Sequence, residues 1–141
     1  MGTSAPRARR AVTSAVSDTL TDVRVVIADD HRLVLDGIKR ALESDGGFEI
    51  VGETQSGTQV LPLVGKTNPD LVLLDVRMPG MGGIEVARRL VASHPEVVVV
   101  LISIEERIDV PSAAQLDAVP LVRKQDFGPR LLRRLWSERR R

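Results

Sequence analysis

Four aliphatic residues run directly into a single carboxylate over residues 71–75, Leu-Val-Leu-Leu-Asp, and a Met-Pro-Gly turn follows at residues 78–80. An uninterrupted apolar run of this length, with turn-forming residues on both sides, predicts a strand that is buried on both faces. Asp75 would then lie at the carboxyl end of that strand, where open α/β sheets place their ligands. The carboxylate could serve there as a nucleophile, as a metal ligand or as a cap for the next helix.

The composition narrows the class of protein. A chain of 141 residues with 43% hydrophobic and 28% charged residues fits one globular domain with extensions. Two Phe, one Trp and no Tyr leave few rings for stacking nucleic-acid bases, and the absence of cysteine excludes disulfides and zinc–thiolate sites. No apolar run reaches the roughly 18–20 residues of a membrane span, and the N-terminal residues lack the apolar core of a signal peptide. We therefore expect a cytoplasmic protein.

The net charge of +1 hides an uneven distribution of charge. Residues 23–122 hold nine Lys and Arg against fifteen Asp and Glu, a balance of −6. Residues 123–141 hold eight basic residues against two acidic ones, a balance of +6. An acidic body with a basic end is typical of a metal-binding or phosphate-handling domain that is followed by a linker.

Strand patterns alternate with helix patterns along the chain. Strands are predicted at residues 23–28, 48–53, 71–75, 97–102 and 118–122. Helices are predicted at residues 34–42, 57–67, 84–91 and 127–136. The segment 105–116 is a poor helix because Pro111 interrupts it. Five strands that alternate with helices through short connections predict an α/β fold, a doubly wound five-stranded parallel sheet with helices on both faces.

Ionisable or hydroxyl-bearing side chains follow four of these strands. They are Asp29 and Asp30, Asp75, Ser103 and Lys124. Because the carboxyl ends of parallel strands converge on one crevice, these groups should be neighbours. Three carboxylates crowded together repel one another and call for a cation, and hard oxygen ligands suit Mg²⁺. With a lysine and a hydroxyl beside them, they could hold a phosphoryl group on a carboxylate oxygen.

These residues, in this order, resemble the receiver domains of two-component response regulators. The resemblance runs from about Val23 to Trp136. It is closest to the subgroup usually joined to a LuxR-type helix-turn-helix, which often begins Val-Ile-Ala-Asp-Asp-His, as residues 26–31 do. It implies a flavodoxin-like (βα)5 fold and a phosphorylation-controlled signalling module rather than a metabolic enzyme. A sensor histidine kinase would be its partner.

The resemblance also implies a role for each site residue. Asp75 would accept the phosphoryl group from the histidine kinase. Ser103 would be the switch hydroxyl that moves onto that group, and Lys124 would pair with it. The ligands implied for Mg²⁺ are Asp29, Asp30, Asp75 and the backbone carbonyl of Arg77, with Asp30 favoured as a direct ligand.

Four departures from the family pattern concern the switch more than the site. Ile104 stands where a small residue usually follows the switch hydroxyl, and Leu121 replaces an aromatic residue three positions before the lysine. Gly82 replaces an aspartate that would cap the next helix, which removes its best N-cap candidate. Pro111 and the pair at 117–118, Asp-Ala in place of Gly-Ala, alter the segment before the last strand. A degenerate receiver that acts as a phosphate-independent interaction module is the alternative that these departures keep open.

Other functions fit the residues less well. A phosphatase of the haloacid-dehalogenase type needs a second aspartate two residues after the nucleophile, and Arg77 stands there. Dinucleotide binding lacks a Gly-rich turn after the first strand. Direct nucleic-acid binding is not expected either, because the five residues after Trp136 are too few for a helix-turn-helix. A DNA-binding output domain would lie outside this chain, and a homodimer stays open.

The expected domain organisation has three parts. Residues 1–22 would be a disordered leader, since they mix Ser, Thr, Ala and Arg without apolar periodicity. Residues 23–137 would form the receiver domain, and residues 138–141 a basic tail or linker stub. Next to the acidic pair, His31 is expected to be an exposed residue in the first turn of the helix.

Overall fold

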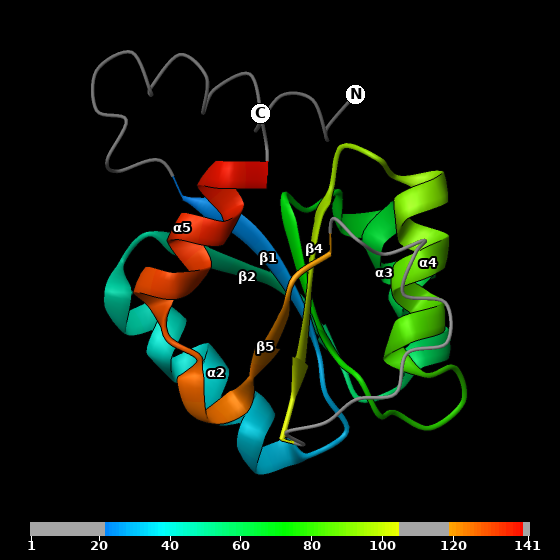
Figure 1. Cartoon of the computed structure of the whole chain (residues 1–141), viewed down its shortest axis with the longest axis horizontal. Helices are drawn as coiled ribbons and strands as arrows, with labels where there is room; N and C mark the ends of the chain where they lie inside the picture. Colours follow the sequence, from blue (N-terminus) through cyan, green and yellow to red (C-terminus); the bar gives the residue numbers. More distant parts are fainter. Residues whose placement is uncertain (1–21, 105–118, 140–141) are drawn as a thin grey trace.

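The computed structural model describes residues 22–104 and 119–139. Its centre is a sheet of five parallel strands in the order β2-β1-β3-β4-β5 (Figure 1). The strands are β1 (Val23–Ala28), β2 (Phe48–Thr54), β3 (Leu71–Asp75), β4 (Val98–Ser103) and β5 (Leu121–Arg123). The predicted doubly wound parallel sheet is therefore confirmed. The expected edge strand is β2, and the Leu71–Asp75 run is the central strand.

Helices cover both faces of this sheet. They are α2 (Arg32–Asp45), α3 (Val60–Thr67), α4 (Gly83–Ser93) and α5 (Pro129–Arg139), with short 3₁₀ turns η2 (Gly57–Gln59) and η4 (Lys124–Asp126). Helices α2 and α5 lie on one face and α3 and α4 on the other (Figure 1). None of the helices within residues 22–104 and 119–139 has the length and apolar character needed to cross a membrane.

Two hydrophobic clusters, one on each face, form the core. Along β1, Val25 and Ile27 pack on the α2–α5 side, whereas Val26 and Ala28 pack on the α3–α4 side. The residues of β3 alternate in the same way, and all five are buried. Successive side chains of a strand point to opposite faces, so a strand covered on both faces needs an unbroken apolar run. That requirement explains the sequence pattern of β3, of β4 and of residues 25–28 of β1.

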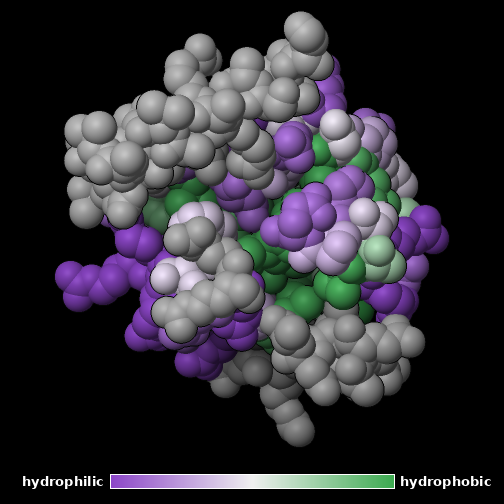
Figure 2. Space-filling view, turned by 90° about the horizontal axis from the view of Figure 1, so that it is seen from above, coloured by the Kyte–Doolittle hydropathy of each residue, from purple (hydrophilic) through white to green (hydrophobic). Residues whose placement is uncertain are grey.

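The strand order places β1 beside β3, although β2 separates them in the sequence. The connection that leaves β1 and the connection that leaves β3 therefore cover opposite faces of the sheet. A switch point of this kind opens a crevice at the carboxyl ends of the strands. In the register, Ala28 pairs with Leu74, and Asp75 pairs with Ile102 of β4. The residues that end or follow β1, β3 and β4 thus meet at one edge. Figure 2 shows the opposite edge, where hydrophobic residues are visible between hydrophilic ones.

Several element boundaries differ from the sequence prediction by one to three residues. Strand β5 begins at Leu121 rather than at 118, because Pro120 has no N–H to donate to a ladder and contributes only its carbonyl, which accepts from the Leu101 N–H at 2.9 Å. Helix α5 continues to Arg139, past the domain end predicted at 137. The segment around Pro111 lies outside the described residues, as do residues 1–21.

Candidate functional site

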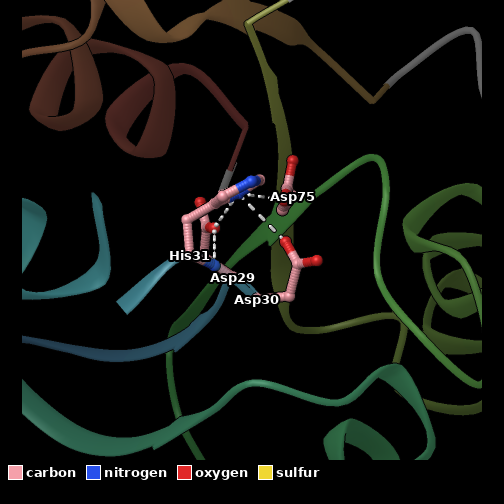
Figure 3. Close-up of side chains that lie close together, drawn as sticks. All are labelled: Asp29, Asp30, His31 and Asp75. Atoms are coloured by element: carbon pink, nitrogen blue, oxygen red, sulfur yellow. Dashed lines mark hydrogen bonds and ion pairs between the residues drawn. The ribbon is translucent and has the colours of Figure 1, made fainter. Parts of the chain in front are cut away.

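Three aspartates from two neighbouring strand ends face one another. Asp29 and Asp30 follow β1 directly, and Asp75 is the last residue of β3 (Figure 3). Asp29 is fully buried, the side chain of Asp75 is only 5% exposed, and that of Asp30 is one-third exposed. Carboxylate oxygens of all three lie within 4.8 Å of one another. We call Asp29, Asp30 and Asp75 the acidic cluster. The strand ends therefore bring together the carboxylates that the sequence singled out.

Lys124 supplies a positive charge to this cluster. It follows β5 in η4, and its side chain is only 11% exposed. Its Nζ lies 2.8 Å from Asp29 Oδ2 and 3.5 Å from Asp75 Oδ1. The Lys124 ammonium therefore pairs with two buried carboxylates, which agrees with the prediction made from the place of Lys124 after the last strand.

The electrostatics of Asp75 differ from those of a surface carboxylate. Burial, together with the negative charge of Asp29, raises the pKa of the Asp75 carboxyl to about 6, and Lys124 offsets part of that rise. The backbone N–H of Arg77 also donates to the Asp75 carboxylate. Among the described residues, Asp29 Oδ2, Asp30 Oδ1 and Asp75 Oδ2 are buried and receive no well-formed hydrogen bond. Buried carboxylate oxygens without donors favour the binding of a cation.

Ser103 and Arg77 lie close to Asp75, the first through the strand register and the second along the chain. Ser103 ends β4 and is buried, one residue beyond Ile102, the register partner of Asp75. Arg77 comes two residues after Asp75 in the chain and is exposed. The position of Ser103 at the end of β4 agrees with the sequence prediction. The roles of the Ser103 hydroxyl and of the Arg77 carbonyl stay predictions.

Two residues that depart from the family pattern are exposed. Ile104, directly after Ser103, is 62% exposed, and Leu121 at the start of β5 is 44% exposed. Both apolar residues are therefore open to solvent in good part, near the edge of the sheet that carries the site. Neither is part of the two core clusters.

The loop from β3 to α4 depends on glycine. The N–H of Gly83 donates to the carbonyl of Val76 at 2.8 Å, and a Cβ atom built on Gly83 would lie only 2.0 Å from the Asp75 carbonyl oxygen. Any side chain there would push α4 away from the end of β3. Gly82 is the N-cap of α4 in extended conformation and provides no side-chain cap, as the sequence predicted. The sequence analysis missed the packing role of Gly83, and the Gly-Gly pair at 82–83 was the available signal.

The sequence analysis also missed the contact of His31 with the acidic cluster. His31 is the N-cap of α2, and its side chain is 57% exposed, as expected for a residue in the first turn. Its ring nevertheless points to the acidic cluster (Figure 3), with Nδ1 3.1 Å from Asp30 Oδ1, 3.4 Å from Asp29 Oδ1 and 3.9 Å from Asp75 Oδ2. The signal in the sequence was its position directly after the acidic pair.

The fold and the site together define a class of protein. A doubly wound parallel sheet holds a buried carboxylate at the end of its central strand, with two more carboxylates and a lysine beside it. Such a site can hold a divalent cation and keep a carboxylate oxygen ready to react with an anionic group.

Comparisons with known proteins give the family. The family model of the response regulator receiver domain matches residues 25–135. The chain belongs to this family and is a receiver domain of the two-component response regulators. It is 42% identical over 90 residues to the response regulator GacA of Pseudomonas viridiflava, covering 64% of this chain and 42% of GacA. It is 44% identical over 81 residues to the probable transcriptional regulatory protein NarL of Mycobacterium tuberculosis, covering 57% and 38%. The chain thus spans less than half the length of these curated relatives.

Solved structures agree with this assignment. The receiver domain of the response regulator NarL from M. tuberculosis has a TM-score of 0.72 and 33% identity, covering 84% of this chain and 98% of that one. A LuxR-family DNA-binding response regulator from Staphylococcus aureus has a TM-score of 0.71 and 26% identity, covering 81% and 98%. The flavodoxin-like receiver fold and the similarity to LuxR-type regulators are therefore confirmed.

Proposed function

We propose that Asp75 is the phosphoacceptor of this receiver domain. The observation that carries the proposal is its position: it is the one carboxylate at the end of the central strand that is buried beside both the acidic pair and Lys124. In the reaction, a carboxylate oxygen attacks the phosphorus of a phosphohistidine or of acetyl phosphate. The bond from phosphorus to the donor breaks, and the donor leaves with the electron pair. Water later hydrolyses the acyl phosphate slowly, so the chain acts as a switch rather than as a metabolic enzyme.

The residues around Asp75 fit the needs of that transfer. Lys124 Nζ lies 3.5 Å from Asp75 Oδ1, so it can pair with the phosphoryl oxygens after transfer. The buried Ser103 hydroxyl is proposed to approach the phosphoryl group from β4. Mg²⁺ would be held by Asp29, Asp30, Asp75 and the Arg77 carbonyl, and it would neutralise charge on the transferred group. The buried carboxylate oxygens without hydrogen-bond donors support this assignment.

The partners follow from the family. We propose a sensor histidine kinase as the phosphoryl donor and a cytoplasmic location, where such a donor is charged with ATP. A DNA-binding output domain outside this chain is proposed from the relatives, among which RcsB of Salmonella enterica was solved bound to the promoter rprA. That structure has a TM-score of 0.74 and 26% identity, covering 84% of this chain and 64% of that one.

Mass spectrometry tests the phosphoacceptor. Incubation with acetyl phosphate and Mg²⁺ should add one phosphoryl group to the wild type and none to Asp75→Asn. Asp126→Asn is the matched control, because Asp126 is an exposed carboxylate that pairs with Arg123. Equal labelling of the wild type and Asp75→Asn would refute the assignment.

Cation binding tests the acidic cluster. Replacement of Asp30 by Asn removes a carboxylate that is one-third exposed and free of the Lys124 ion pair, so the fold should survive. We expect Mg²⁺ affinity to fall at least about tenfold, as it does when even the outer partners of a metal site are lost. Unchanged affinity would remove Asp30 from the ligand set.

A degenerate receiver that works without phosphorylation is the second candidate. The exposed Ile104 and Leu121 favour it, because both replace residues through which receivers usually couple the site to the output surface. The labelling experiment separates the two functions, since a degenerate receiver would stay unmodified in the presence of acetyl phosphate and Mg²⁺.

A further inference from the structure

We propose that His31 Nδ1 is a ligand of the cation held by the acidic cluster. It would make the site favour transition-metal ions such as Co²⁺ and Mn²⁺ over Mg²⁺ more strongly than carboxylates alone would. This inference rests on the proposed function, because it takes the acidic cluster as a cation site. It adds a nitrogen ligand and a metal preference.

The His31 ring lies beside the three carboxylates of the acidic cluster and could add a fourth ligand to a bound ion. Its Nδ1 is 3.1 Å from Asp30 Oδ1, 3.4 Å from Asp29 Oδ1 and 3.9 Å from Asp75 Oδ2 (Figure 3). In an octahedral site with ligands at about 2.1 Å, neighbouring ligand atoms are about 3.0 Å apart and opposite ones about 4.2 Å apart. Each of the three separations lies within about 0.4 Å of one of these two values. One ion could therefore touch Nδ1 and these carboxylates after shifts of only a few tenths of an ångström.

The acidic cluster holds buried carboxylate oxygens that receive no hydrogen bond of good geometry from the described residues. Asp75 has a side chain that is only 5% exposed, and among the described residues its Oδ2 receives no hydrogen bond of good geometry. Asp29 is completely buried, and its Oδ2 lies 2.8 Å from the Lys124 ammonium. Leaving such oxygens without donors is costly, and an ion at the centre of the cluster would satisfy them.

The backbone fixes the histidine at this place. Its N–H donates to Asp29 Oδ1 at 2.9 Å, and its carbonyl accepts from the Leu35 N–H at 2.9 Å, which is the first hydrogen bond of α2. The Cα position of His31 is therefore set by a helix start and by the cluster itself. A ligand held in this way loses little freedom when it binds an ion.

The kind of ligand decides the preference for the metal. Carboxylate and carbonyl oxygens suit Mg²⁺, whereas imidazole suits first-row transition metals, and affinity at a mixed site rises from Mn²⁺ to Co²⁺ and beyond. An imidazole ligand should therefore raise the affinity for Co²⁺ while it changes the affinity for Mg²⁺ little.

Calorimetric titration of the full chain with Mg²⁺ and with Co²⁺ tests the inference. We expect His31→Ala to lower the Co²⁺ affinity at least about tenfold, since loss of a mere outer partner already costs that much. The Mg²⁺ affinity should change less than about threefold. His94→Ala is the matched control, because the sequence has only two histidines and His94 ends α4, where its Nδ1 contacts Ser93. It should bind both ions as the wild type does.

A spectroscopic readout checks the contact directly. With Mn²⁺ bound, electron spin echo spectra should show modulation by a coordinated ¹⁴N in the wild type and in His94→Ala but not in His31→Ala. If both ions bind the wild type and His31→Ala keeps the Co²⁺ affinity and the ¹⁴N signal, the inference is wrong and the proposed function stands. If neither ion binds the wild type, the proposed cation site and this inference both fail.

Discussion

Replacing Asp75 by Asn should stabilise the metal-free protein at neutral pH. The Asp75 side chain is almost fully buried next to the buried Asp29, and the two share the single ammonium of Lys124. Asparagine has nearly the same shape but no charge. The substitution therefore relieves repulsion and desolvation at the site and leaves Lys124 paired with Asp29.

The size of the effect follows from the pKa. Burial and the charge of Asp29 raise the pKa of Asp75 from 3.8 to about 6. A difference of this size corresponds to about 3 kcal/mol by which the folded state disfavours the ionised carboxyl. Because this pKa already includes the attraction to Lys124, and asparagine only approximates the neutral acid, we expect a gain of about 1–3 kcal/mol in the free energy of unfolding at neutral pH. That gain would raise the thermal midpoint by about 5–10 °C in a domain of this size.

The pH dependence of this stability difference tests the sign of the effect separately. Because the folded pKa of Asp75 lies above the unfolded one, the folded wild type binds more protons between about pH 4 and pH 6. The contribution of Asp75 to stability is fully present below about pH 4 and is lost as the pH rises through about 6. The variant should therefore match the wild type near pH 4 and exceed it increasingly up to about pH 7.

Urea unfolding followed by circular dichroism in EDTA, from pH 4 to pH 8, measures this difference. Asp126→Asn is the control and should change stability by less than about 0.5 kcal/mol at every pH, because its carboxylate is exposed. Mg²⁺ should narrow the gap between the wild type and Asp75→Asn, since a bound cation stabilises only a protein that binds it. A variant less stable than the wild type at pH 7, or a gap independent of pH, would refute the reasoning.

Four further perturbations test the fold and the switch. Leu132→Ala should cost about 2–5 kcal/mol in urea unfolding, because that side chain is buried in the core on the α2–α5 face. Gly83→Ala should cost about 1–3 kcal/mol by the same assay and weaken Mg²⁺ binding measured by calorimetry, because its Cβ would clash with the carbonyl that ends β3. Deleting 138–141 should shift the thermal midpoint in calorimetry by only a few degrees, since the described residues of that stretch are exposed; a drop of ten degrees or more would mean that they pack. Beryllofluoride should perturb the amide shifts of 104–122 only modestly, because Leu121 has no ring to turn in behind the switch hydroxyl; large shifts throughout would show an intact switch.

The sequence alone determined the elements and the class of fold. Strand β4 up to Ile102, strand β3 up to Leu74 and residues 25–28 of β1 are continuous apolar runs, because the requirement for burial on both faces is local to each strand. The same logic located the site: a carboxylate that ends a buried parallel strand must lie at the edge where the other strands end. Asp29, Asp30, Asp75 and Lys124 could thus be placed together from their positions in the chain. What each of them does in phosphoryl transfer is a proposal for the experiments above.

The tertiary structure alone decided the contacts that depend on strand order and on the packing of loops. The ring of His31 faces the acidic cluster because β1 and β3 are neighbours, whereas its sequence pattern predicts only an exposed residue in the first turn. Gly57 and Gly83 are needed because backbone from distant positions approaches them, with a Cβ only 1.6 Å from the Met81 carbonyl oxygen at Gly57 and 2.0 Å from that of Asp75 at Gly83. Hydrophobic periodicity reports which face of an element is buried. It carries no information about which backbone atom lies opposite, and that is why the contacts of these residues became evident only in the folded chain.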